Sequence, residues 1–127
     1  MNASRQVRLV QVLKVLAEPN RLALLDQIIR GYQCNCQLGD ELGLPANLIS
    51  HHLGVLRDAD LIVSERDALD ARWVYYSVNK ATLKALNDAF SAFFDIERVQ
   101  PRRLTCGPQV ALAESDGLAM RDDGRPG

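Results

Sequence analysis

Two cysteines separated by one residue are the first candidates for chemistry. Cys34 and Cys36 lie in the stretch GYQCNCQLGDEL, and the chain of 127 residues holds three cysteines in all. Thiolates are the ligands that soft metal ions prefer. Residues i and i+2 point about 200° apart on a regular helix, but to the same side of an extended segment. If the pair binds one ion, we expect it to lie just before the helix that follows, where both sulfurs can face the same side. The alternative is a pair of partly buried structural thiols.

The composition is that of one ordinary globular domain. Hydrophobic residues make up 47% of the chain and charged residues 24%, and the net charge is −1. Without a global basic field, any nucleic-acid binding must come from local geometry. No stretch is typical of a membrane span or a signal peptide, so we expect a cytoplasmic protein with no membrane partner. Because a reducing cytosol keeps thiols reduced, we expect thiols and not a disulfide framework.

A helix-turn-helix is predicted directly after the cysteine pair. A short helix covers roughly residues 37–42, and a longer one runs from Pro45 to about Ala59. Two faces of the longer helix differ in polarity: Ile49, Leu53 and Leu56 form one, and Asn47, Ser50, His51 and Gly54 form another. We expect Asn47, Ser50 and His51 to contact DNA in the major groove, with simple exposure as the alternative for His51. His52 leans toward the apolar side and is expected to be a hydrogen-bonded packing residue.

A β-hairpin follows. Residues 61–66 and 72–78 are rich in β-branched and aromatic side chains, and the DALDA stretch between them reads as the hairpin tip. A helix-turn-helix followed by a hairpin is a winged helix. Arg57, Arg66 and Arg72 are the candidate phosphate contacts. Asp67 and Asp70 lie beside the two hairpin arginines and oppose that role, so we expect the wing to add little affinity.

The outer helices are predicted at residues 3–17, from Pro19 to about Gly31, and at 80–97. The first is apolar nearly all round and the last carries a heptad-like seam, so both need covering partners. We expect a dimer interface formed by Leu9, Leu13, Leu86, Phe90 and Phe93; packing within one domain is the alternative. The fold class is therefore mainly α with a small β-hairpin, a homodimeric winged helix-turn-helix in residues 1–100, with residues 101–127 as a flexible C-terminal segment.

Three stretches resemble one known family. They are LAEPNRLALLDQI (16–28), LGDELGLPANLISHHLGVLRDADLIVSER (38–66) and RWVYYSV (72–78), and they resemble the ArsR/SmtB family of bacterial metal-sensing repressors. The resemblance implies a winged-helix homodimer that binds an imperfect palindrome in double-stranded promoter DNA and loses affinity when an effector binds. A zinc site found in this family, made of Asp, His and Glu on the last helices, is missing here, because the two histidines both lie in the predicted DNA-reading helix.

The cysteine pair resembles the motif of the arsenic-sensing branch of this family. Cys34 and Cys36 occupy its two positions in YQCNCQL, whereas the third cysteine of the best-known version is replaced by Gly39. The resemblance implies As(III) or Sb(III) as the effector, held by three thiolates. Cys106, in PRRLTCGP beyond the last helix, is the candidate third ligand, from its own subunit or across the dimer. The alternative is that Cys106 is an incidental thiol.

Other functions stay open at this stage. Cd(II) or Pb(II) could fill a thiolate site of the same kind, and the cysteines could instead serve a thiol-redox repressor. A winged helix can also be a protein-interaction module that binds no DNA. An enzyme is the least expected class, because no Ser/His/Asp set, phosphate loop or pair of catalytic acids appears and no permanent cofactor is implied.

Overall fold

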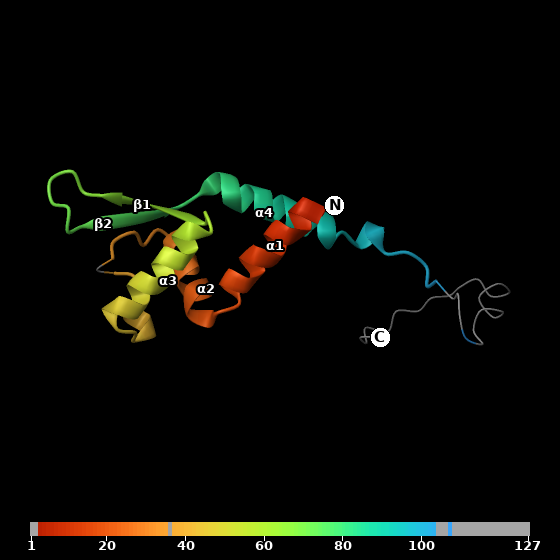
Figure 1. Cartoon of the computed structure of the whole chain (residues 1–127), viewed down its shortest axis with the longest axis horizontal. Helices are drawn as coiled ribbons and strands as arrows, with labels where there is room; N and C mark the ends of the chain where they lie inside the picture. Colours follow the sequence, from red (N-terminus) through yellow and green to blue (C-terminus); the bar gives the residue numbers. More distant parts are fainter. Residues whose placement is uncertain (1–2, 36, 104–106, 108–127) are drawn as a thin grey trace. The chain divides into compact units, whose positions relative to one another are not determined.

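The computed structural model describes residues 3–35, 37–103 and 107, with side chains from Arg8 onward. These residues divide into two units, Met1–Phe93 and Phe94–Gly127. The first unit holds four α-helices and a two-stranded hairpin, which Figure 1 shows in sequence colours. The described residues of the second unit include the 3-10 turn η2 (Ile96–Arg98). The boundary predicted between residues 100 and 101 falls inside the second unit and stays a prediction.

The first two helices begin and end where their end residues predict. Helix α1 spans Ala3–Leu16 and α2 spans Pro19–Ile29. Pro19 occupies the first turn of α2, where its missing N–H costs nothing, and the Glu18 carboxylate caps the helix by accepting the Arg21 N–H at 3.0 Å. Gly31 follows α2 with a φ of +105°, a conformation that favours glycine. The helices predicted at 3–17 and from Pro19 are confirmed.

The short helix predicted at 37–42 is wrong in its length and type. Its regular part is a single 3-10 turn, η1 (Asp40–Leu42), between Gly39 at a φ of +85° and Gly43 at +66°. Two left-handed glycines four residues apart leave room for only one turn between them. The longer helix, α3 (Ala46–Asp58), is confirmed, with Pro45 as its N-cap and Ala59 as its C-cap.

The hairpin has the predicted strands. Strand β1 (Ile62–Arg66) pairs antiparallel with β2 (Val74–Val78), and Ile62 lies opposite Val78. The segment before η1 adds to the outer edge of β2, because Cys34 forms an isolated antiparallel bridge with Tyr75. Figure 1 shows the hairpin extending away from the helices, with its tip at the far end from α4.

The last helix is shorter than predicted. Helix α4 spans Lys80–Phe93, whereas the sequence pattern suggested that it continued to residue 97. The Asp95 carboxylate accepts the N–H of Glu97 at 3.0 Å and so starts the new turn η2.

The core of the first unit joins its helices to the root of the hairpin. α1 contacts α2 and α4, while α2 also contacts α3 and β2. The buried apolar side chains are Leu9, Val12, Leu24, Leu25, Ile28, Leu38, Leu53, Leu56, Leu61, Ile62 and Leu86. Among the described residues, no helix has the length and apolar character needed to cross a membrane.

Candidate nucleic-acid interface and effector site

Helix α3 has the two-faced character that the sequence predicted. Leu53 and Leu56 are 2% and 0% exposed and anchor the helix in the core. Asn47, Ser50 and His51 all lie among the exposed residues of the same helix. The three predicted base contacts therefore share an accessible face, and their contact with DNA stays a prediction.

The start of α3 is well suited to a negatively charged ligand. Pro45 has an extended backbone, and its carbonyl oxygen accepts the N–H groups of Leu48 at 3.0 Å and Ile49 at 3.2 Å. The first turn contains no acidic residue, and Arg57 lies in the last turn. The positive end of the helix dipole is therefore not neutralised by a carboxylate of its own first turn, which favours a phosphate nearby.

The turn between η1 and α3 is built around Gly39. A Cβ placed on Gly39 would lie 2.8 Å from Ile49 Cγ1 and closer still to Cδ1. The Gly39 N–H donates to the side-chain oxygen of Gln27 at 3.0 Å, and Gln27 is 5% exposed. Gln27 thus fixes the turn from within α2. Sequence reasoning missed this role, for which the only signal was an amide among the apolar residues of α2.

This geometry explains why position 39 differs from the Cys-x-Cys motif that the sequence resembles. Any side chain at position 39 would meet Ile49 and would hold an unfavourable positive φ. A third cysteine at this position is incompatible with the observed turn. A third sulfur for the site must therefore come from elsewhere in the chain or from a partner.

Cys34 lies before η1, where an isolated β-bridge ends and a turn begins. Whether the cysteine pair can share one ion stays a prediction, because Cys36 lies outside the described residues. Cys34 is 8% exposed and pairs with Tyr75 through the isolated bridge. Its carbonyl oxygen accepts the N–H groups of Gln37 at 2.8 Å and Leu38 at 3.1 Å, and the next residue, Asn35, donates to the carbonyl of Val74. Cys34 therefore joins the helix-turn-helix to the half of strand β2 that lies nearer the tip of the wing.

The bonding state of Cys34 differs from the expectation. Cys34 is disulfide-bonded in this structure, whereas the sequence analysis expected a reduced thiol. A disulfide forms when an oxidant removes two electrons and two protons from a pair of thiols, so a disulfide and a thiolate site are two states of one redox couple. Cys36 and Cys106, the other predicted ligands, lie outside the described residues. Within the described part of the chain, no three His, Cys, Asp or Glu side chains gather as a metal site.

The tip of the wing is organised by two carboxylates. Asp67 accepts the N–H groups of Leu69 at 2.8 Å and Asp70 at 3.1 Å, and the Tyr75 hydroxyl donates to it at 3.0 Å. These backbone and side-chain hydrogen bonds lower the pKa of Asp67. The hydrogen bond between the Tyr75 hydroxyl and the Asp67 carboxylate raises the pKa of Tyr75. The tip is therefore an ordered, acidic turn.

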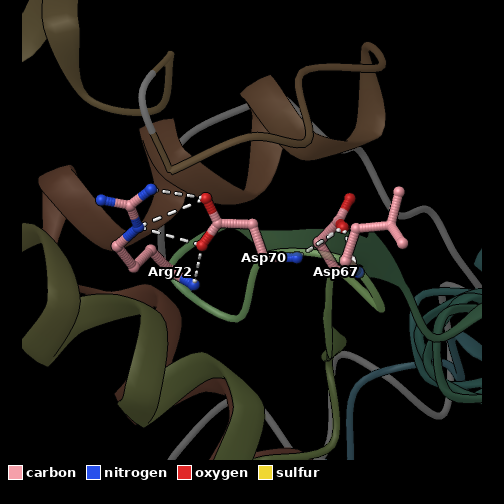
Figure 2. A network of polar contacts seen from close by, with 4 residues as sticks. Asp67, Asp70 and Arg72 are labelled. Carbon is pink, nitrogen blue, oxygen red and sulfur yellow. Dashed lines mark hydrogen bonds and ion pairs between the residues drawn. The ribbon is translucent and has the colours of Figure 1, made fainter.

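Arg72 is held by the second of these carboxylates. Its Nε lies 3.0 Å from Asp70 Oδ1 and its Nη2 lies 2.7 Å from Oδ2, as Figure 2 shows. The hydrogen bonds from the Arg72 side chain and backbone lower the pKa of Asp70. The Asp70 carboxylate neutralises the charge of Arg72 locally and occupies its Nε and Nη2 donors, so a phosphate gains less from this guanidinium. This arrangement agrees with the expectation that the wing adds little affinity.

The two other predicted phosphate contacts, Arg66 and Arg57, are less closely paired with carboxylates than Arg72 is. Arg66 donates from Nη1 to the Ala71 carbonyl at 2.7 Å and keeps its charge without a carboxylate partner in that contact. Arg57 lies 3.7 Å from Asp58, and both side chains are mostly exposed. The phosphate roles of Arg57, Arg66 and Arg72 stay predictions.

His52 is the packing residue that the sequence predicted. Its side chain is 12% exposed, with Nδ1 lying 3.4 Å from Arg21 Nη1 and Nε2 lying 3.7 Å from Glu18 Oε2. Although desolvation acts to raise the pKa of Glu18, the N–H groups of Arg21 and Asn20 lower it overall. The back of α3 is thus tied to the start of α2 by polar contacts.

The predicted dimer residues divide between the core and the surface. Leu9 and Leu86 are buried and Phe90 packs against the core, whereas Leu13 and Phe93 are 44% and 40% exposed. A cavity of about 250 Å³ lies between α1 and α4 and is lined by Arg8, Leu9, Ala85, Leu86, Asp88 and Ala89. α1 and α4 therefore offer a partly apolar joint surface, and its pairing with a second copy stays a prediction.

Comparisons with known proteins agree with this fold. Residues 18–64 match the profile of a family described as "Bacterial regulatory protein, arsR family". The chain is 32% identical to the nodulation protein NolR of Rhizobium meliloti over 93 residues, which cover 70% of the chain and 74% of NolR. It is also 32% identical to the arsenical resistance operon repressor of Bacillus subtilis, over 60% of the chain and 70% of the repressor.

A solved structure gives the same result in three dimensions. The crystal structure of a "possible transcriptional regulator for arsenical resistance" superposes with a TM-score of 0.57 at 32% identity, over 67% of the chain and 85% of that protein. Similar relatives thus include both a nodulation protein and arsenical repressors. The comparisons establish a family, and the choice of effector rests on the chain's own residues.

Proposed function

The chain belongs to the arsR family of bacterial regulatory proteins, and from this premise we propose that it is a homodimeric repressor whose cysteines sense a thiol-binding effector. Proteins of this family are transcriptional regulators that bind promoter DNA and function as dimers. The observation that carries the DNA-binding part is α3, which is anchored by Leu53 and Leu56 and exposes Asn47, Ser50 and His51.

DNA binding follows from placing two such helices in one dimer. Recognition helices of paired helix-turn-helix units enter successive major grooves about 34 Å apart, so the operator is an imperfect palindrome. Asn47, Ser50 and His51 contact base edges, while Arg57 and Arg66 contact phosphates with little help from Arg72. Such a protein acts in the cytoplasm, where the promoter DNA is.

The effector we propose is As(III) or Sb(III), bound by thiolates of Cys34, Cys36 and Cys106 in the reduced protein. Two observations support this. Cys34 lies just before η1, and it contacts both the turn into η1 and strand β2. The relatives also include arsenical resistance repressors. A ligand that rearranges Cys34 would shift the helix-turn-helix and the wing together and lower DNA affinity.

Direct binding of the ion separates this effector from other soft ions. Reduced protein is titrated with arsenite, Cd(II) or Pb(II), and binding is followed by thiolate absorption in the ultraviolet. We expect one As(III) per site, with binding lost in Cys34→Ser and Cys36→Ser. Loss in Cys106→Ser supports the third-ligand role, and retained binding there contradicts it. Tight Cd(II) or Pb(II) binding without As(III) binding would overturn the proposed effector.

DNA binding itself is tested by its salt dependence. The affinity of the reduced dimer for its own promoter DNA is measured between about 50 and 200 mM salt, where a protein that contacts several phosphates loses affinity steeply. A protein-interaction module would show no such binding. Asn47→Ala and His51→Ala should weaken operator binding, while Asp26→Ala on the exposed face of α2 serves as the control.

A second candidate function has its own observation. Cys34 is disulfide-bonded in this structure, which favours a repressor controlled by oxidation. In that reaction two thiols lose two protons and two electrons to hydrogen peroxide, which becomes two molecules of water. Operator binding that peroxide abolishes and dithiothreitol restores, in a protein that ignores arsenite, would establish this version. Peroxide without effect on the operator complex would exclude it.

A further inference from the structure

A cluster of polar contacts joins three helices at a point that neither the recognition face nor the cysteines occupy. Its centre is Arg21, in the first turns of α2. Arg21 Nε donates to the Val15 carbonyl of α1 at 2.7 Å, and Arg21 Nη1 lies 3.4 Å from Nδ1 of His52 on α3. One guanidinium therefore contacts the end of α1 and the back of the recognition helix at once.

Both contacts of Arg21 supply a hydrogen-bond donor to a polar group, the carbonyl of Val15 and the ring of His52. Val15 lies in the last turn of α1, where backbone carbonyls have no partner within the helix and arginine side chains can serve instead. A guanidinium only donates, so this contact is a hydrogen bond in the tautomer of His52 whose Nδ1 carries no proton. The other ring nitrogen of His52 faces Glu18 at 3.7 Å. His52 is thus held from both sides by residues at the start of α2.

The carboxylate in this cluster also fixes Arg21 itself. Glu18 Oε2 accepts the backbone N–H of Arg21, and Glu18 Oε1 accepts the side-chain amide of Asn20 at 3.3 Å. The lowered pKa of Glu18 keeps its carboxylate ionised at neutral pH. The donors of a guanidinium are held in one plane at fixed angles. The two contacts of Arg21 therefore fix the position of His52 relative to the Val15 carbonyl.

We propose that Arg21 is a positioning residue that fixes the recognition helix α3 relative to α1 through Val15 and His52. This inference rests on the proposed function, in which α1 carries dimer contacts and α3 contacts DNA. In such a dimer, the distance between the two α3 helices depends on how each α3 is held on its own α1. Arg21 then sets which half-site spacing the dimer accepts, without touching DNA.

The first test measures spacing selectivity. Operators with the native half-site spacing, and with one base pair added or removed, are titrated with the wild type and with Arg21→Ala. We expect the ratio between altered and native dissociation constants to fall by a factor of roughly 3 or more in Arg21→Ala and His52→Ala. His52→Gln, whose side-chain oxygen can accept from Arg21, should keep most of the selectivity. Arg30→Ala removes the same charge from α2, where Arg30 pairs with Asp26, and should change nothing.

A second measurement needs no DNA. Spin labels introduced at position 58 through a non-natural amino acid report the distance between the two α3 helices by pulsed electron resonance. We expect a narrow distribution in the wild type, a broad one in Arg21→Ala and a narrow one in Arg30→Ala. The proposal would be overturned if the distance distributions of the wild type and Arg21→Ala had equal widths, or if the wild type were a monomer. It would also be overturned if Arg21→Ala lost the same affinity for all operator spacings. A broadened variant of a wild type that binds no DNA would support the positioning role and contradict the proposed function instead.

Discussion

At the scale of single residues, Cys34 and Gly39 determine what kind of effector site this chain can have. Cys34 joins the segment before η1 to strand β2, and Gly39 closes the turn into α3 against Ile49. The sequence predicted that the cysteine pair lies before the short helix, and Cys34 does precede η1. The sequence could not predict the need for glycine at position 39, because that need comes from contacts with Gln27 and Ile49 on two other helices.

Substitution of Gly39 tests this explanation. Gly39→Ala has both a positive φ and a collision with Ile49, so we expect it to destabilise the fold by about 2 kcal/mol or more. Gly43→Ala is the matched control, because its φ is also positive but nothing lies within 4 Å of its Cβ position. It should cost only about 1 kcal/mol. Urea unfolding of both variants gives the comparison, and equal losses would contradict the role of Ile49.

At the scale of elements, helix and strand positions were largely predictable, and the ends that depend on tertiary contacts were not. Apolar periodicity placed α3, and Pro19 and Gly31 placed the ends of α2. The length of η1 depended on the glycines on either side of it, and α4 ended at Phe93, before the end that its pattern suggested. The strands of the wing were likewise predictable from their β-branched residues. The pairing of Arg72 with Asp70 was not predictable.

The pairing of Arg72 predicts how the wing responds to a charge change. Asp70→Asn removes the carboxylate that holds Arg72 and so allows the guanidinium to reach a phosphate. We expect operator affinity to rise, and the slope of log affinity against log salt to steepen by about 1. Asp26→Asn makes the same charge change on α2 and should not steepen the slope. A slope in Asp70→Asn equal to that of the wild type would show that Arg72 stays away from DNA.

The hydrogen bonds to Asp67 predict a dependence of stability on pH. Since the folded state lowers the pKa of Asp67, its contribution is fully present above the ordinary carboxylate pKa of about 4 and is lost as the pH falls below it. Asp67→Asn should therefore unfold at a lower temperature than the wild type at pH 7, and the difference should shrink below about pH 4. Thermal unfolding across this range checks it; a difference that grows on acidification would contradict the assigned sign.

At the scale of the whole molecule, the account depends on pairing through α1 and α4. Leu9 and Leu86 of the predicted interface are buried within one chain, whereas Leu13 and Phe93 are partly exposed. The sequence identified this seam from its heptad-like spacing. It could not tell which members a single chain buries, because that depends on how α1 packs on α4.

Dimerisation can be tested at Leu13. Leu13→Glu places a charge on the exposed part of the predicted interface, and we expect it to weaken the dimer at least tenfold with little loss of monomer stability, because the side chain is already 44% exposed. Leu22→Glu is the control, since Leu22 is 52% exposed on α2. Sedimentation equilibrium measures both. Dissociation by Leu22→Glu and not by Leu13→Glu would place the interface on α2.

The most direct test of the account is the affinity of the reduced protein for its own promoter DNA, measured with and without arsenite. The account predicts nanomolar-range operator binding that arsenite weakens about 5- to 150-fold, with no weakening in Cys34→Ser. Operator binding that arsenite leaves unchanged in the fully reduced wild type would contradict the effector assignment. A wild type that does not bind the promoter at all would contradict the account as a whole.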